Sequence, residues 1–236
     1  MMVVIHEDEK LIVINKPNGL LVHPSRIARD AEVFALQQVR DYVGQHVHPV
    51  HRLDRKTSGV LLFAKDKAVL NTYRERLAHH ETIKTYLALV RGFFPESVKV
   101  DHPLVDEKGK SKAALTHFEC IQHYEIPFST GKFSTSRYAL IKAFPKTGRM
   151  HQIRRHLNHL RHPIIGDRPH GCNKQNRFFL AQWGLENMCL HAASLALFNP
   201  ETGEHDDFHA ELPAFFTAFI SRMKKANLLK INVIER

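Results

Sequence analysis

One short segment of the sequence constrains its surroundings more than any other. Residues 60–64, Val-Leu-Leu-Phe-Ala, form an uninterrupted apolar run, which is typical of a strand buried on both faces. The preceding residues 57–59, Thr-Ser-Gly, are typical of a turn. Asp54 lies just before this turn, within the basic segment 52–56. We therefore expect a carboxylate held on a loop beside a rigid, buried strand.

The basic residues around Asp54 favour the charged form of its carboxylate. An ionised and well-positioned carboxylate can act as a nucleophile or a base, but it is a poor proton donor. The alternative is an Asp that caps a turn or pairs with an arginine at the surface. For an isolated Asp among basic residues this alternative is the more common one, so the choice depends on the whole segment 51–59.

Segment 51–59, His-Arg-Leu-Asp-Arg-Lys-Thr-Ser-Gly, resembles the catalytic motif of the RluA-type pseudouridine synthases in its residues and its spacing. In that family the Asp of the motif is the catalytic nucleophile, so the resemblance implies this role for Asp54. His51 is part of the motif and is expected to help hold the loop.

A second segment, Lys-Thr-Tyr at 84–86 followed by Val-Arg-Gly at 90–92, resembles the family motif whose Tyr packs on the target uracil. The resemblance implies that role for Tyr86. A lone Tyr in a strand belongs to the core more often than to an active site, but the distance from segment 51–59 fits the family. Leu190, in a Leu-His-Ala segment, resembles a Leu that packs near the target base.

A third segment, Thr-Gly-Arg-Met-His-Gln-Ile-Arg at 147–154, resembles the motif whose Arg forms an ion pair with the catalytic Asp. Arg154 occupies the position after Gln and Ile, so the resemblance implies this ion pair with Asp54. Arg149 is the second candidate for it.

The charge of the chain indicates an anionic partner. Lys and Arg outnumber Asp and Glu by 34 to 24, and residues 146–177 alone hold eight basic residues and one acidic residue. Such clustering is expected of a surface that contacts a phosphate backbone, whereas an even spread would indicate solvated side chains. The residues expected to contact RNA are His51, Arg52, Arg55, Lys146, Arg149, Arg155, Arg161 and Arg177.

Strand-like segments outnumber helical ones and do not alternate regularly with them, which predicts an α+β fold. Strands are expected at residues 2–5, 11–14, 60–64, 84–92, 98–105, 114–121 and 136–144, and helices at about 33–43 (capped by Asp30), 67–80 (capped by Asp66), 147–160 and 214–225. The family's fold, a largely antiparallel mixed sheet flanked by helices with a basic central cleft, agrees with this pattern. The family pattern begins near Leu11, so we expect a single catalytic domain over residues 1–236 without an N-terminal RNA-binding module.

The apolar stretches, cysteines and histidines of the sequence bear on the expected cofactors and cellular location. No apolar stretch is long enough to span a membrane, the N-terminus does not resemble a signal peptide, and the three widely spaced cysteines are typical of reduced thiols in the cytoplasm. The 18 histidines raise the alternative of a metal-dependent hydrolase, but no His-Glu-x-x-His or Cys-x-x-Cys pattern is present. The isomerisation of uridine to pseudouridine, which the resemblance implies, needs neither metal nor redox chemistry. We expect no cofactor, no metal, no membrane association and no obligatory protein partner.

Within the family, several further segments of the sequence resemble the branch that modifies uridine 65 of tRNA. The resemblance lies in residues 29–30, 136–140, 145–157 and 175–177, and tRNA is the expected partner. Enzymes acting on large-subunit ribosomal RNA share the main motifs and are the alternative. A non-catalytic RNA-binding protein would have a similar surface, but the presence of Asp54 and Tyr86 disfavours it.

Overall fold

The computed structural model describes residues 2–24 and 33–229, and these divide into two compact units. The first unit contains Met1–Thr85 and His191–Leu212, and the second contains Tyr86–Leu190 and Pro213–Arg236. The chain passes between them three times, within the strands β5 (Ile83–Arg91) and β11 (Leu190–Phe198) and between Leu212 and Pro213. The expected single domain and basic cleft stay predictions.

The strands of the first unit follow the order β1-β2-β4-β11-β12, and β3 adds to β4. All pair in antiparallel fashion except β4 and β11, which run parallel. Their bounds are β1 Val3–Glu7, β2 Leu11–Lys16, β3 His48–Pro49, β4 Ser58–Ala64 and β12 His205–His209. All seven residues of β4 are buried, which confirms the expected buried strand.

Two helices belong to the first unit, α1 (Ala35–Val43) and α2 (Lys67–Ala78). The cap of α2 is as predicted, because the Asp66 carboxylate accepts the Val69 N–H at 2.8 Å. Helix α1 ends at Gly44 as expected but begins after an extended Phe34, so the prediction of a helix from residue 33 was wrong. Asp30, the expected cap of α1, lies outside the described residues.

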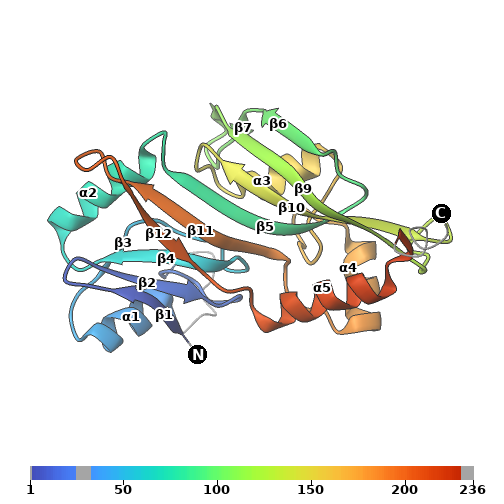
Figure 1. Ribbon diagram of the computed structural model, residues 1–236, viewed down its shortest axis with the longest axis horizontal. Helices are drawn as coiled ribbons and strands as arrows, with labels where there is room; N and C mark the ends of the chain where they lie inside the picture. Colours follow the sequence, from blue (N-terminus) through green and yellow to red (C-terminus); the bar gives the residue numbers. More distant parts are fainter. Residues whose placement is uncertain (1, 25–32, 230–236) are drawn as a thin grey trace. The chain divides into compact units, whose positions relative to one another are not determined.

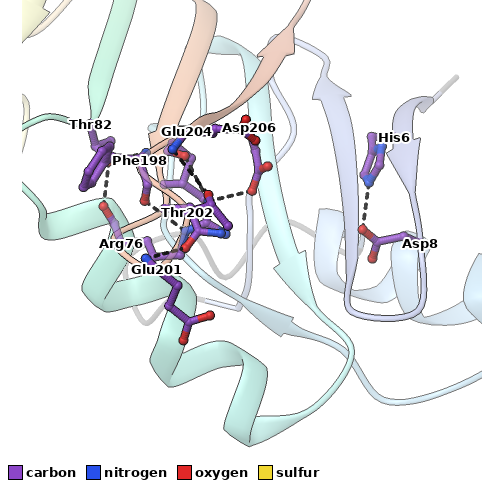
Figure 2. A network of polar contacts seen from close by, with 11 residues as sticks. His6, Asp8, Arg76, Thr82, Phe198, Glu201, Thr202, Glu204 and Asp206 are labelled. Carbon is purple, nitrogen blue, oxygen red and sulfur yellow. Dashed lines mark hydrogen bonds and ion pairs between the residues drawn. The ribbon is translucent and has the colours of Figure 1, made fainter.

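Arg76 in the last turn of α2 braces this helix against the β11–β12 hairpin (Figure 2). Its guanidinium donates to the carbonyls of Leu197 and Phe198, at 3.0 Å each, and to the Asp206 carboxylate at 2.6 Å. The Thr82 hydroxyl donates to the Arg76 carbonyl at 2.6 Å and accepts the Phe198 N–H at 3.0 Å. Burial of this charge is tolerated because the guanidinium is hydrogen-bonded within the unit.

The second unit contains an antiparallel sheet in the order β5-β10-β9-β6 (Figure 1). The bounds are β10 Ser136–Pro145, β9 Leu115–Ile126 and β6 Ser97–Asp101, and β7 (Leu104–Val105) pairs with β8 (Ser111–Lys112) separately. The strand expected over residues 98–105 is therefore two strands. It breaks beside Pro103, which has no amide hydrogen for a ladder.

Three helices pack within the second unit, α3 (Gln152–His159), α4 (Asn173–Trp183) and α5 (Ala214–Ala226). The helix expected from residue 147 begins only at Gln152, because His151 has a left-handed backbone with φ +54°. The closing helix was predicted to within one residue, whereas α4 was not predicted. Figure 1 shows α4 beside α5, and the rings of Phe179 and Trp183 contact Phe219.

Gly59 is the point of closest approach between β4 and β11. It has φ +114°, and a Cβ atom at this position would lie 2.1 Å from the Ala192 carbonyl oxygen. We predict that Gly59→Ala lowers the free energy of unfolding by about 3 kcal/mol or more, because the strands must separate and the backbone is strained. Denaturant unfolding would measure this loss.

Gly44→Ala is the matched control, because Gly44 also has a positive φ, +75°, but no atom lies within 4 Å of the added Cβ. It should cost only the backbone strain, about 1 to 2 kcal/mol. Equal losses for the two variants would contradict the importance of the close approach at Gly59.

Candidate active site

Asp54 lies on a turn that leads directly into β4. The Thr57 N–H donates to the Asp54 carbonyl at 3.0 Å and closes this turn. Thr57, Ser58 and Gly59 are buried beneath it, while Asp54 is half-buried. The motif therefore places a carboxylate at the surface of a firmly anchored loop, as the sequence predicted.

A second turn, residues 16–20, clasps the turn that carries Asp54. The Gly19 N–H donates to the Arg55 carbonyl at 2.9 Å, and the Arg55 Nε–H donates to the Gly19 carbonyl at 3.1 Å. The Asn18 side-chain amide also donates to the Lys56 carbonyl. Part of the hydrogen-bonding capacity of Arg55, which was expected to contact RNA, is therefore used to hold the loop.

The clasp is built around the side chain of Lys16, which is fully buried. Its Nζ donates to the carbonyls of Pro17 (3.0 Å), Leu20 (2.8 Å) and Arg55 (3.1 Å), so each N–H of the ammonium has an acceptor. Burial lowers the pKa of Lys16 to about 7, and the nearby charge of Asp54 opposes this shift. Lys16 is thus a cation enclosed under the loop and close enough to Asp54 to interact with it.

Residues 15–19 are typical of a turn and resemble the family's Lys-Pro-x-Gly turn, but the sequence did not predict a role for Lys16. A lysine two positions after the apolar run 11–14, on the same side of the strand as Ile12 and Ile14, was the available signal. In β2 residues 11–14 and 16 are all buried, and a buried lysine requires compensating partners.

Ser58 and His191 connect the catalytic motif to the Leu-His-Ala segment. The Ser58 hydroxyl lies 2.9 Å from His191 Nδ1, and His191 Nε2 lies 3.0 Å from the Ala210 carbonyl. Since a carbonyl only accepts, Nε2 carries the hydrogen and Nδ1 accepts from Ser58. Both side chains are buried, and burial lowers the pKa of His191. The pair therefore fastens two buried strands as neutral groups.

His51 holds the motif from the other side. Its Nε2 accepts the Leu62 N–H at 3.3 Å, and burial of the ring lowers the pKa of His51 to about 4. The imidazole is therefore neutral near pH 7. This geometry supports the expected role of His51 in holding the loop, and its role as an RNA contact stays a prediction.

In the second unit, Arg154 extends from α3 and forms a bidentate ion pair with Asp167. Its Nε and Nη2 donate to the two carboxylate oxygens at 2.7 and 2.9 Å, and the two residues are only 6% and 1% exposed. Asp167 also accepts the His170 N–H at 3.2 Å. Asp54 belongs to the first unit, so the expected pair between Arg154 and Asp54 stays a prediction. The sequence did not predict the role of Asp167.

Tyr86 and Leu190 belong to one hydrophobic cluster in the second unit. Leu190 is buried in this core, and the half-buried Tyr86 packs against it from β5, opposite Ala143 of β10. The two residues expected around the target base thus share one apolar surface. Their contact with a base stays a prediction.

Comparisons with known proteins identify the family of this chain. The profile of the family described as RNA pseudouridylate synthase matches residues 10–159. The chain belongs to the RNA pseudouridylate synthase family. It is therefore an isomerase that converts uridine to pseudouridine in RNA.

Relatives and solved structures cover nearly the whole pseudouridine synthase chain. Proteins named tRNA pseudouridine synthase C from Vibrio cholerae and Haemophilus ducreyi are 40% and 43% identical to it, over 98% and 84% of this chain and 100% and 86% of theirs. The structure of human RNA Pseudouridylate Synthase Domain Containing 4 superposes with a TM-score of 0.70 at 26% identity, covering 94% of this chain and 93% of that one. The expected α+β fold of the family is confirmed.

The basic residues expected to contact RNA are not equivalent in this pseudouridine synthase. Arg149 donates to the Ala113 carbonyl and Arg155 to the Val105 carbonyl, at 3.0 Å each. Arg52, Lys146, Arg161 and Arg177 are exposed. All remain predicted contacts, but Arg149 and Arg155 also contribute to the structure of the second unit.

Across residues 2–24 and 33–229, no group of three or more His, Cys, Asp or Glu side chains is arranged to hold a metal ion. The described helices are also too short or too polar to cross a membrane.

The low pKa of Lys16 makes stability depend on pH. In the unfolded chain its pKa returns to about 10.5, so between about pH 7 and 10.5 the unfolded state binds more protons than the folded state. The penalty for burying Lys16 is therefore complete below pH 7 and decreases as the pH rises. The free energy of unfolding should increase by at most about 1.4 kcal/mol per pH unit in this window.

Denaturant unfolding of the wild type and of Lys16→Met from pH 6 to pH 9 tests this prediction. Above pH 7 the free energy of unfolding should rise in the wild type relative to Lys16→Met, because Met does not titrate. The control is Lys67→Met, at an exposed position of α2, for which the difference should stay constant. A constant difference for Lys16→Met would show that Lys16 stays charged throughout.

Proposed function

We propose that this enzyme isomerises uridine 65 of tRNA in the cytoplasm, with Asp54 as its nucleophile. The observation that carries the chemistry is the clasped turn that holds a half-buried Asp54 above buried Thr57, Ser58 and Gly59. Support for tRNA comes from relatives named tRNA pseudouridine synthase C and from the sub-pattern at residues 136–140 and 145–157.

The reaction breaks the bond between ribose C1′ and uracil N1 and joins C1′ to uracil C5, while the C5 proton leaves and N1 gains a proton. A carboxylate can form the required transient bond with either the sugar or the uracil ring. Both routes need Asp54 as the charged nucleophile, and both need the detached base to stay in place while it turns.

Tyr86 is proposed to pack on the target base, with Leu190 close by. The target uridine must leave its helical stack to reach a protein carboxylate, which costs unstacking energy. An aromatic ring packed on an apolar core, as Tyr86 is, can replace the lost stacking because every base has a flat face.

Arg154 is proposed to pair with the Asp54 carboxylate. The bidentate contact with Asp167 fixes the plane of the guanidinium. A guanidinium has donors on both edges of its plane, so its pairing with Asp167 is compatible with a second carboxylate. The exposed cations Arg52, Lys146, Arg161 and Arg177 are proposed to bind phosphates.

Asp54→Asn should remove turnover and retain RNA binding. The change is nearly isosteric but removes the nucleophile, so the rate of pseudouridine formation should fall by at least about 10³-fold. Asp41→Asn is a control at an exposed position of α1 and should retain the wild-type rate. Pseudouridine formation by a homogeneous Asp54→Asn sample would overturn the assignment.

The choice of substrate is tested by mapping pseudouridine in purified tRNA and in fragments of large-subunit ribosomal RNA, each treated with the same enzyme. We expect modification of tRNA uridine 65 and none in the ribosomal fragments. The reverse pattern would assign the enzyme to ribosomal RNA and leave the chemistry of Asp54 unchanged. Binding without modification of either RNA would support a non-catalytic RNA-binding protein.

A further inference from the structure

The second unit contains a cavity of about 350 Å³ beside α4. Arg168, Arg177, Leu180, Leu185 and Glu186 are among the residues that line it. Its volume lies at the lower end of the range of small-ligand sites, about 300 to 1,000 Å³. None of the side chains assigned to the chemistry above lines it.

The guanidinium groups of the two arginines in the cavity have no partner within the described part of the chain. Among the described residues, the side chains of Arg168 and Arg177 form no hydrogen bond or ion pair, and both are exposed. By contrast, the buried Arg76 and Arg154 each donate to acceptors in their own units. Two unpaired guanidiniums lining one cavity favour an anionic ligand, because guanidinium geometry matches a phosphate.

The wall of the cavity is rigid before any ligand binds. The Asn176 side chain accepts the Gly166 N–H at 2.9 Å and donates to the Asp167 carbonyl at 2.7 Å, which ties α4 to the turn that precedes Arg168. Gly166 is packed so tightly that an added Cβ would lie 2.2 Å from the Asn187 carbonyl oxygen. Binding would therefore order mainly the two exposed arginine side chains and not the backbone of the wall.

The remaining lining is apolar with one acceptor. Leu180 is 43% exposed and so presents an apolar side chain to a ligand, and Leu185, which also lines the cavity, is buried. Glu186 contributes a carboxylate that can accept a hydrogen bond from a base N–H or a ribose hydroxyl. A ligand that matches all three features has a phosphate, an apolar flat face and a hydrogen-bond donor.

We propose that this cavity binds one unstacked nucleotide of the RNA substrate, with its phosphate at Arg168 and Arg177 and its base against Leu180. The proposal rests on the proposed function only in that the partner is RNA. It assigns the cavity to the recognition of RNA, since protein–RNA specificity commonly comes from unstacked bases.

The test measures tRNA affinity against salt concentration in the Asp54→Asn enzyme, where no turnover interferes. Loss of the one phosphate contact that both arginines share, in Arg168→Gln/Arg177→Gln, should lower the magnitude of the log–log salt slope by about 0.7 to 0.9. The control Lys224→Gln/Lys225→Gln removes equal charge from exposed positions of α5 in the same unit. An equal change of slope in both double variants would overturn the proposal.

Two further variants distinguish a specific nucleotide site from non-specific attraction of RNA by positive charge. Arg168→Lys/Arg177→Lys should keep the salt slope but bind more weakly, because lysine cannot form the bidentate contact. Leu180→Gln should bind more weakly at an unchanged slope. Chemical probing should find a nucleotide whose reactivity changes on binding the Asp54→Asn enzyme and not its Leu180→Gln form; no such nucleotide would refute the proposed base contact.

The cavity and the proposed function fail in different ways. Pseudouridine formation in tRNA by the wild type, with a salt slope that the arginine substitutions do not change, would refute the cavity alone. RNA binding that depends on Arg168 and Arg177, with no pseudouridine formed, would refute the proposed function and leave the cavity in place.

Discussion

A buried ammonium group holds the loop that carries Asp54. The Nζ of Lys16 donates to carbonyls on two segments that are far apart in sequence, residues 17–20 and Arg55. Without this group the carbonyls of Pro17 and Leu20 would lose this donor and the Arg55 carbonyl would keep only the Gly19 N–H. A buried acceptor without a partner costs about 1 to 3 kcal/mol. The end of β2, the clasping turn and the Asp54 turn therefore depend on one side chain, which also places a cation near the nucleophile.

The buried cations of the chain differ in a way that follows from their chemistry. Arg76 and Arg154 keep their charge at any ordinary pH, and each is bound by a carboxylate. Lys16 is bound by neutral carbonyls, and burial brings its pKa to about 7. The arginines thus serve as permanent braces, whereas the loop around Asp54 depends on a group that titrates. Arg168 and Arg177, which have no internal acceptor in the described chain, are available to a ligand.

The sequence predicted the parts of the fold that depend on local chemistry and missed those that depend on distant contacts. The apolar run of β4 and the Asp66 cap of α2 are local signals, and both were confirmed. The start of α3 was wrong because His151 adopts a left-handed backbone and its Nδ1 lies 2.9 Å from Nε2 of His170. Likewise, the buried Arg154 pairs with Asp167, which lies 13 positions away in the sequence. No short pattern indicates such pairs.

The segments that carry the family resemblance in the first unit contact one another in the folded chain. Segment 51–59 requires glycine at its end because the backbone of Ala192 lies where a side chain would be. It requires a small hydroxyl residue before that glycine because Ser58 binds His191, and its Asp54 turn is closed over Lys16. Ser58 and Gly59 are thus explained by partners on another segment, in the register of β4 against β11. A match to separate segments at once therefore indicates the folded loop itself, whereas a match to any one of them would indicate only a turn or a strand.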